Sequence, residues 1–312
     1  MIKGNKIIAE AIRDVGIETI FTVAGGHFLP TYNEIGIIGA TKIIPARHEQ
    51  GAGYMASGYA LATGRVGVVL SGAPGPGATN LVTSVANAQA DSIPMLVLSA
   101  QVDKRYLHRN ILQYCDNVAL FEPFCKSSIQ AASLDEIPNL LSTSIQLALS
   151  GRQGPVHISL PQNLQAETTS SQKNIPFKQL NTGKPSDIDI KTLLEKLRNC
   201  KRPAIIAGHG VLRSGSSILL KEVAEKIGAP VATSRSGIGS ISTNHSQSVG
   251  MLGFYGTETA RNSVNEADLV LVLGCALGEQ TTFGWRSEIF ATDAHIVQVD
   301  IDASQLNRVY KL

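Results

Sequence analysis

The chain has 312 residues, which a prior of about 100–200 residues per domain divides into two domains. Its hydrophobic content of 43% is enough for ordinary buried cores. Its net charge of +2, from 27 basic and 25 acidic residues, favours neither nucleic acid nor a membrane surface as a partner. The N-terminus lacks the apolar core of a secretory signal, and no apolar run reaches about 18 residues. We therefore expect a cytoplasmic protein without a membrane-spanning helix.

Strand and helix patterns alternate through the first half of the chain. Apolar residues at helical spacing over 5–15 predict a helix that Gly16 ends. Short apolar runs then predict strands, and amphipathic or small-residue segments predict helices. The strands are expected over 19–26, 41–46, 65–72, 93–100 and 154–161, and the helices over 49–64, 77–91 and 134–151. Continuous apolar strands alternating with helices indicate a mostly parallel sheet covered on both faces.

The second half repeats this alternation after a polar segment without periodicity. We expect a first domain over 1–165, a linker over 166–185 and a second domain over 186–312. In the second domain, helices are expected over 190–200 and 216–228, and strands over 202–210, 229–235, 267–277 and 295–302. The fold class is therefore α/β, with two doubly wound domains. The four cysteines form no CxxC pair, which favours small buried thiols over a zinc or redox site.

Ligands of parallel α/β sheets gather at the carboxyl ends of the strands, so the residues there are the first candidates. His27 follows the first strand, His48 and Glu49 follow the second, and Gln101 follows the fourth. Taken locally, Glu49 is explained as a first-turn helix acid, worth roughly 0.3–1 kcal/mol, or as a partner of Arg47. The glycine-rich segment SGAPGPGATN over 71–80 matches neither GxGxxG nor the Walker pattern and lacks a lysine. We interpret it as a loop presenting backbone to an uncharged ring, or as a plain turn.

Four ordered motifs together resemble the thiamine-diphosphate enzymes of the acetolactate synthase type. They are GGHFLP (25–30), RHEQGAGYMASGYA (47–60), SGAPGPGATNLVTSVANAQADSIPMLVLSAQ (71–101) and SGRQGPVHISLPQNLQ (150–165). The second half continues the match, with RPAIIAGHGV, MLGFYGTETARNSVNEADLVLVLGCALGEQ and VQVDIDASQL resembling the family's central domain. The resemblance covers essentially the whole chain. It implies a pyrimidine-binding domain followed by a Rossmann-like central domain.

The resemblance assigns Glu49 a catalytic role. In such enzymes a glutamate after the second strand hydrogen-bonds a ring nitrogen of the cofactor's aminopyrimidine and favours the imino tautomer, whose nitrogen deprotonates the thiazolium carbon. Other positions are implied to contact the cofactor. Gly25 and Gly26 match glycines near the reaction centre, Gly77, Ala78, Thr79 and Asn80 match the loop by the pyrimidine, Gln113 matches a glutamine facing the thiazolium, and Arg152 matches an arginine that contacts flavin. A surface cation at a turn is the alternative reading of Arg152.

Departures from the family pattern leave the substrate open. The second domain reads GCALGEQTTFG where acetolactate synthases have an Arg-Phe-Asp-Asp-Arg run, and Gln162 stands where synthases usually carry lysine. GGHFLP also looks like relatives of the 2-hydroxyacyl-CoA lyase type. The resemblance therefore implies a 2-keto acid or an acyl-CoA substrate, and it leaves FAD binding open. A 2-hydroxyacyl-CoA lyase or oxalyl-CoA decarboxylase is the alternative enzyme.

The resemblance also implies a division of the cofactor site. The family's third domain carries a Gly-Asp-Gly segment and an asparagine that hold Mg²⁺ and, through it, the diphosphate. This chain has no such segment and no metal ligands of its own are expected. We expect a fragment of a longer enzyme, or a module that needs a partner chain. The family's site lies between subunits, so a homodimer or tetramer is expected.

Overall fold

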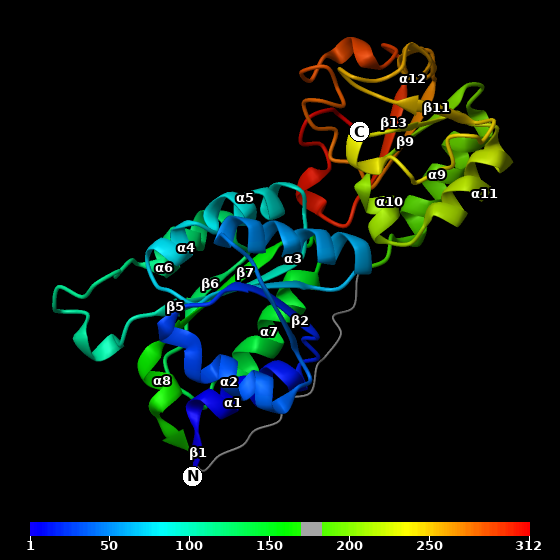
Figure 1. Ribbon diagram of the computed structural model, residues 1–312. Helices are drawn as coiled ribbons and strands as arrows, with labels where there is room; N and C mark the ends of the chain where they lie inside the picture. Colours follow the sequence, from blue (N-terminus) through cyan, green and yellow to red (C-terminus); the bar gives the residue numbers. More distant parts are fainter. Residues whose placement is uncertain (170–182) are drawn as a thin grey trace. The chain divides into compact units, whose positions relative to one another are not determined.

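The computed structural model describes residues 1–169 and 183–312 (Figure 1). The chain divides into two compact units, Met1–Asn181 and Thr182–Leu312. Most of the linker expected over 166–185 falls on residues 170–182, outside the described residues. Each unit contains its own parallel sheet.

The sheet of the first unit has six parallel strands in the order β3-β2-β4-β5-β7-β6. The strands are β2 Thr19–Val23, β3 Lys42–Pro45, β4 Gly67–Ser71, β5 Met95–Gln101, β6 Ser128–Gln130 and β7 Pro155–Pro161. Every residue of β4, β5 and β7 is buried, which explains their continuous apolar runs. A separate antiparallel pair joins β1 (Ile2–Lys3) to β8 (Thr168–Thr169).

Helices cover both faces of this sheet (Figure 1). They are α1 Gly4–Asp14, α2 Leu29–Ile38, α3 Glu49–Thr63, α4 Pro76–Thr79, α5 Val82–Ala90, α6 Asn117–Phe121, α7 Ile137–Leu149 and α8 Gln162–Ala166. One core lies between α1, α7 and strand residues such as Leu70 and Leu98. A second core on the opposite face packs α3 and α5 against Val69 and Val97. The helix expected over 77–91 is divided into α4 and α5.

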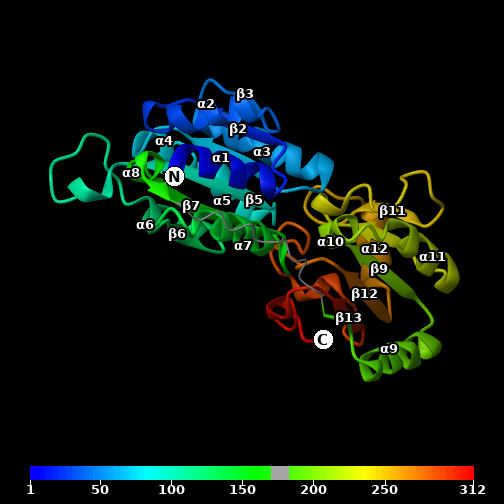
Figure 2. The same ribbon diagram turned by 90° about the horizontal axis from the view of Figure 1, so that it is seen from below.

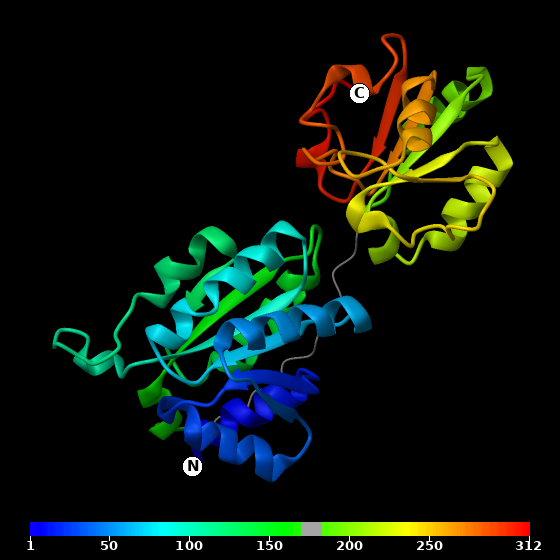
Figure 3. The same ribbon diagram turned by 45° about the horizontal axis from the view of Figure 1, so that its top comes forward.

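The second unit has five parallel strands in the order β11-β10-β9-β12-β13. Figures 2 and 3 show its ribbon from two further sides. Its strands are β9 Pro203–Ala207, β10 Val231–Thr233, β11 Ser248–Met251, β12 Leu269–Leu273 and β13 His295–Val299, and its helices are α9 Asp187–Asn199, α10 His209–Arg213, α11 Ser217–Ile227 and α12 Glu258–Asn265. Numbered within the unit, the strand order is 3-2-1-4-5, that of a Rossmann-type sheet. Two cores, one containing α12 and the other α11, cover its faces. The prediction of two doubly wound α/β domains is confirmed.

Candidate functional site

The strand order of the first unit places a reversal point between β2 and β4. From β2 the chain moves outward to β3, and then returns to the other side of β2 to form β4. Ligands of open α/β sheets bind at the carboxyl ends of the strands beside such a point. Gly25 follows β2 and Gly72 follows β4, and a Cβ atom on Gly25 would lie 2.3 Å from the carbonyl of Gly72. The two backbones are therefore in direct contact, which only glycine permits.

Glu49 begins α3 above this point. His48 caps the helix, with its Nδ1 accepting a hydrogen bond from the Gln50 amide at 3.2 Å. The Glu49 side chain is buried, at 8% exposure, and its Oε2 accepts a hydrogen bond from Asn80 Nδ2 at 2.9 Å. A carboxylate at a helix N-terminus is favoured by the helix dipole, and the Asn80 amide adds a directed donor. The Oε1 atom makes no hydrogen bond to any described residue.

The loop from Gly72 to Asn80 is shaped around that carboxylate. Gly75 has a left-handed φ of 54°, and α4 begins at the next residue. A Cβ atom on Gly77 would lie 2.3 Å from Ser71 Oγ and 3.3 Å from Glu49 Oε1. Glycine at this position therefore leaves room beside the free oxygen of Glu49. Ala78 is buried, and Thr79 is exposed with its hydroxyl bonded to Pro76.

Gln113 is brought to the same loop although it lies between β5 and α6. It adopts a left-handed φ of 66°, and a Cβ atom on Gly75 would lie 2.2 Å from the Gln113 carbonyl oxygen. The Gln113 side chain is exposed. Gln101, at the end of β5, holds the returning segment because its Nε2 donates to the Cys115 carbonyl at 2.8 Å. The structure therefore brings together Glu49, Gly25, Gly77, Asn80 and the backbone of Gln113.

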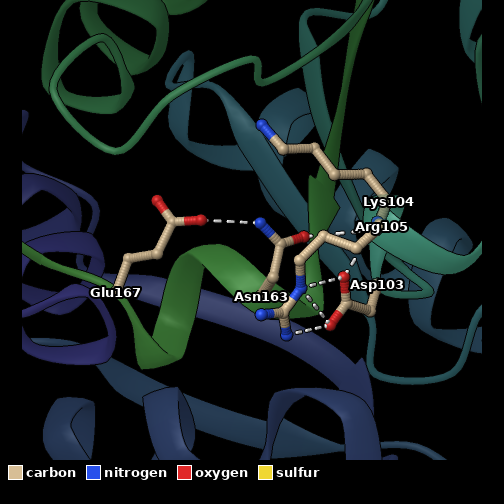
Figure 4. Close-up of polar contacts among 5 residues, drawn as sticks. All are labelled: Asp103, Lys104, Arg105, Asn163 and Glu167. Carbon is tan, nitrogen blue, oxygen red and sulfur yellow. Dashed lines mark hydrogen bonds and ion pairs between the residues drawn. The ribbon is translucent and has the colours of Figure 1, made fainter.

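The segment that carries Gln113 starts in a polar cluster at the carboxyl ends of β5 and β7 (Figure 4). Asp103 caps the short helix Lys104–Tyr106 and forms an ion pair with Arg105. The Arg105 hydrogen bond lowers the pKa of Asp103, so its charge persists. Asn163, on α8, accepts from the Lys104 amide at 3.3 Å and donates to Glu167 at 2.7 Å. This cluster is structural, because each member is tied to a neighbour.

Gly26 and Arg152, the two other predicted cofactor contacts, differ in their surroundings from the residues gathered around Glu49. Gly26 has open space around it, with no atom within 4 Å of a Cβ built there. Arg152 precedes β7 and is therefore at the amino edge of the sheet, opposite Glu49. Its Nε donates to Ser92 Oγ at 2.8 Å, which holds the turn before β5. The structure does not bring Arg152 to the Glu49 group, and its contact with flavin stays a prediction.

The second unit has a reversal point between β9 and β12. A Cβ atom on Gly208 would lie 2.2 Å from the Gly274 carbonyl oxygen, so backbones touch here as well. His209 follows, with its Nδ1 at 3.0 Å from the Ser236 carbonyl and its Nε2 accepting from Arg213 Nε at 2.9 Å. The Nη2 of Arg213 is buried and has no partner among the described residues. No carboxylate is buried in the described part of this unit.

Comparisons with known proteins agree with this architecture. Residues 2–120 match the model of the thiamine pyrophosphate enzyme N-terminal TPP-binding domain, and residues 190–312 match that of the thiamine pyrophosphate enzyme central domain. The chain belongs to the thiamine pyrophosphate enzyme family. The resemblance predicted from the sequence motifs is therefore confirmed, and both units match the family's domain types.

Among the thiamine pyrophosphate enzymes, the chain is similar to acetolactate synthase large subunits. The chain is 36% identical over 313 residues to the acetolactate synthase large subunit of Buchnera aphidicola from Schizaphis graminum, covering 99% of the chain and 54% of the relative. It is 37% identical over 311 residues to a probable acetolactate synthase large subunit of Methanococcus aeolicus (98% and 51%), and 34% identical over 312 residues to that of Lactococcus lactis (99% and 54%). The chain spans about half the length of these relatives.

Two side chains near the Glu49 site of this thiamine pyrophosphate enzyme were not predicted from the sequence. Tyr32, on α2, has its hydroxyl 2.5 Å from Thr22 Oγ1. Burial raises the pKa of Tyr32, and the charge of Glu49 adds to the rise, so this phenol stays protonated. Gln165, on α8, reaches the turn after β2. Neither could be found from spacing, because both depend on which strand ends meet.

The described residues contain neither a metal-binding cluster nor a membrane-spanning helix. Within 1–169 and 183–312, no group of three His, Cys, Asp or Glu side chains is arranged to hold a metal ion. In the same ranges, no helix combines the length and apolar character needed to cross a membrane. The four cysteines are free, and Cys275 is buried.

Proposed function

We propose that the first unit binds the aminopyrimidine end of thiamine diphosphate, with Glu49 as the catalytic acid. The observation that carries this proposal is the buried Glu49 carboxylate at the reversal point. Its Oε2 is held by Asn80 and its Oε1 is open on the Gly77 side. Gly25, Gly26, Gly77, Ala78, Thr79, Asn80 and Gln113 would line the cofactor. The residues present fit the group, because a flat ring needs room beside the acid and a backbone edge with open glycines.

The chemistry divides between cofactor and protein. When bound, thiamine diphosphate supplies the electron sink for making or breaking a bond next to a carbonyl. Glu49 would hold a proton at Oε1 and share it with a ring nitrogen, while Asn80 fixes the carboxylate plane. Burial excludes water from this exchange, and the protonated Tyr32 nearby adds no second negative charge. General acid–base groups of this kind contribute roughly 10²–10⁴-fold to rate.

We propose acetolactate synthase-like carboligation or decarboxylation of 2-keto acids as the activity of the whole protein. The relatives named acetolactate synthase, which match nearly the whole chain at 34–37% identity, support this choice. A lyase or decarboxylase acting on an acyl-CoA is the second candidate, favoured by the GCALGEQTTFG segment in the second unit. A module that is inactive without a partner chain is the third.

The remaining cofactors and partners rest on the resemblance. We propose that Mg²⁺ and the diphosphate are held by a further domain of the family type, across a subunit interface in a homodimer or tetramer. From the resemblance we propose FAD as a further cofactor of the whole protein, with Arg152 as the residue that would contact it. The prediction of a cytoplasmic location stays a prediction.

The test replaces Glu49 by Gln in the complete gene product. Wild type supplied with thiamine diphosphate, Mg²⁺ and pyruvate is expected to yield acetolactate, and Glu49→Gln to lose roughly 10²–10⁴-fold in kcat because glutamine cannot share the proton. Glu258→Gln is the matched control, since Glu258 also begins a helix, α12, but is exposed. Near-normal turnover by Glu49→Gln would refute the assignment. Turnover of an acyl-CoA instead of pyruvate would favour the second candidate, and the visible spectrum of the same preparation reports flavin.

A further inference from the structure

Gln165 connects two distant parts of the first unit. It lies on α8, which directly follows β7, yet its side chain reaches the turn that follows β2. Its Nε2 donates to the carbonyl oxygen of His27 at 2.5 Å, and its Oε1 accepts from the hydroxyl of Thr31 at 2.8 Å. These partners are 138 and 134 residues away in sequence. Gln165 is 5% exposed and Thr31 is fully buried.

The chemistry of the partners fixes the orientation of this amide. The His27 carbonyl can only accept, so the NH₂ end of Gln165 must face it. The opposite orientation would place two oxygen acceptors against each other in a buried place. Thr31 then donates to Oε1, and both ends of the amide are used. Removing the amide would leave the His27 carbonyl and the Thr31 hydroxyl without these partners, which is costly for buried groups.

The turn that Gln165 holds begins with two glycines, which offer no side chain to anchor their backbone. Gly25 has no side chain and contacts the backbone of Gly72, and Gly26 has no atom within 4 Å of a Cβ position. Phe28, which closes the turn with its amide 3.1 Å from the Gly25 carbonyl, is fully buried. Glycine-rich backbone has wide conformational freedom, so its position must be set from outside.

The helix α8, which carries Gln165, is itself held in place by packing and by a backbone hydrogen bond. Leu164 is fully buried in the core that contains α1. The Gly4 amide donates to the Glu167 carbonyl at 2.8 Å, which ties the end of α8 to the start of α1. Gln165 therefore links the position of a packed helix to that of the turn after β2.

We propose that Gln165 is a positioning residue that sets the backbone of Gly25, Gly26 and His27 against the bound cofactor. This inference rests on the proposed function, since it assigns the turn a place beside thiamine diphosphate. Misplacement of a reacting geometry by about 1 Å can cost 10²-fold in rate. Loss of the Gln165 contact should accordingly lower kcat rather than only stability.

The test variant is Gln165→Met in the complete gene product, because methionine keeps the length of the side chain without the donor. Thr41→Val is the matched control. It removes another buried side-chain bond to a backbone carbonyl, from Thr41 to Ile17 at 2.7 Å, at the amino edge of the same sheet. The readouts are amide exchange of the 25–28 turn, kcat at saturating thiamine diphosphate and substrate, and the thermal midpoint.

Gln165→Met is expected to speed amide exchange in the turn and to lower kcat by about 10–100-fold. Its thermal midpoint should fall below that of Thr41→Val, because two buried groups rather than one lose a partner, so kcat is measured well below both midpoints. Gln165→Glu adds a pH readout. Its carboxylate opposes the His27 carbonyl, whereas its protonated form can donate, so its activity relative to wild type should rise as pH falls. Exchange and kcat equal to those of Thr41→Val would overturn the inference. Failure of the proposed function is seen separately, as an inactive wild type or an active Glu49→Gln.

Discussion

The two units use the same backbone device at the reversal points of their sheets, but they place different chemistry beside it. In the first, Gly25 meets Gly72, and in the second, Gly208 meets Gly274. In the first, the loop that starts at Gly72 reaches the buried carboxylate of Glu49 through Asn80. Beside the second pair lies His209, whose ring is engaged on both sides. The fold therefore locates an edge where a ligand can approach, and the side chains at that edge decide which ligand it is.

Packing explains three glycines of the second edge, Gly208, Gly210 and Gly274. A Cβ atom on Gly210 would lie 2.6 Å from the Gly274 Cα, so the run AGHG needs its glycines for the contact between β9 and β12 loops. In the first unit, Gly25 has the same packing role, but Gly26 and Gly51 have open space at their Cβ positions. Open glycines also follow β10 and β12 in the second unit, at Gly239 and Gly278, so the buried acid is the feature that separates the two edges.

The largest expected effect comes from adding a methyl group at each reversal point. Gly25→Ala and Gly208→Ala each force a Cβ atom against backbone, and each should destabilise its own unit by about 3 kcal/mol. The single tryptophan, Trp285, lies in the second unit, so its fluorescence should report a lower urea midpoint for Gly208→Ala only. The stability of the first unit, which has no tryptophan, is measured by amide exchange of β2 and β4. Gly25→Ala should weaken thiamine diphosphate binding and Gly208→Ala should not. Equal binding by the two variants would contradict the assignment of the cofactor to the first edge.

A buried histidine also distinguishes the first unit, and it has no equivalent in the described residues of the second. His157, on β7, is fully buried, with its Nε2 2.8 Å from Ser99 Oγ and its Nδ1 2.7 Å from Ser128 Oγ. Its ring packs on that of Phe121, at 4.4 Å between centroids. Burial lowers the pKa of His157 from 6.5 to about 3. The folded protein therefore keeps this ring neutral at pH values where an unfolded chain protonates it.

Acid should consequently weaken the first unit more than the second. Above pH 6.5 neither state binds the proton, and between about 6.5 and 3 only the unfolded state does. Stability then falls as pH falls, by about 1.4 kcal/mol per unit, or about 2 kcal/mol at pH 5. His157→Gln, which keeps a donor and an acceptor, should flatten this dependence in amide exchange of β5 and β7. His108→Gln, at an exposed position, should not. An unchanged slope in His157→Gln would contradict the prediction.

The sequence predicted the buried strands and two of the four edge strands, β3 and β13, but it missed the edge strands β6 and β11. β5 and β12 are continuous apolar runs because both of their faces are covered. β6 and β11 were missed because they lack an apolar run: β6 has one apolar residue, Ile129, and Gly250 interrupts β11. Glu49 was found through the family resemblance, and not from local pattern, which explained it as a helix-start acid. Its partner Asn80 was placed in the cofactor loop, but the bond between them depends on strand order.

The smallest expected effect concerns glycines inside two helices. Gly58 lies within α3, which begins at Glu49, and a Cβ atom there meets nothing within 4 Å. Gly58→Ala should therefore stabilise the first unit by about 0.5–1 kcal/mol, since alanine loses less backbone entropy on folding. Gly210→Ala, in α10 beside His209, should destabilise the second unit because its Cβ meets Gly274. Amide exchange measures the change in stability of the first unit, and urea unfolding followed by Trp285 fluorescence measures that of the second. Stabilisation by Gly210→Ala would mean that a side chain fits between the loops after β9 and β12, and close packing would then no longer explain the glycine at this position.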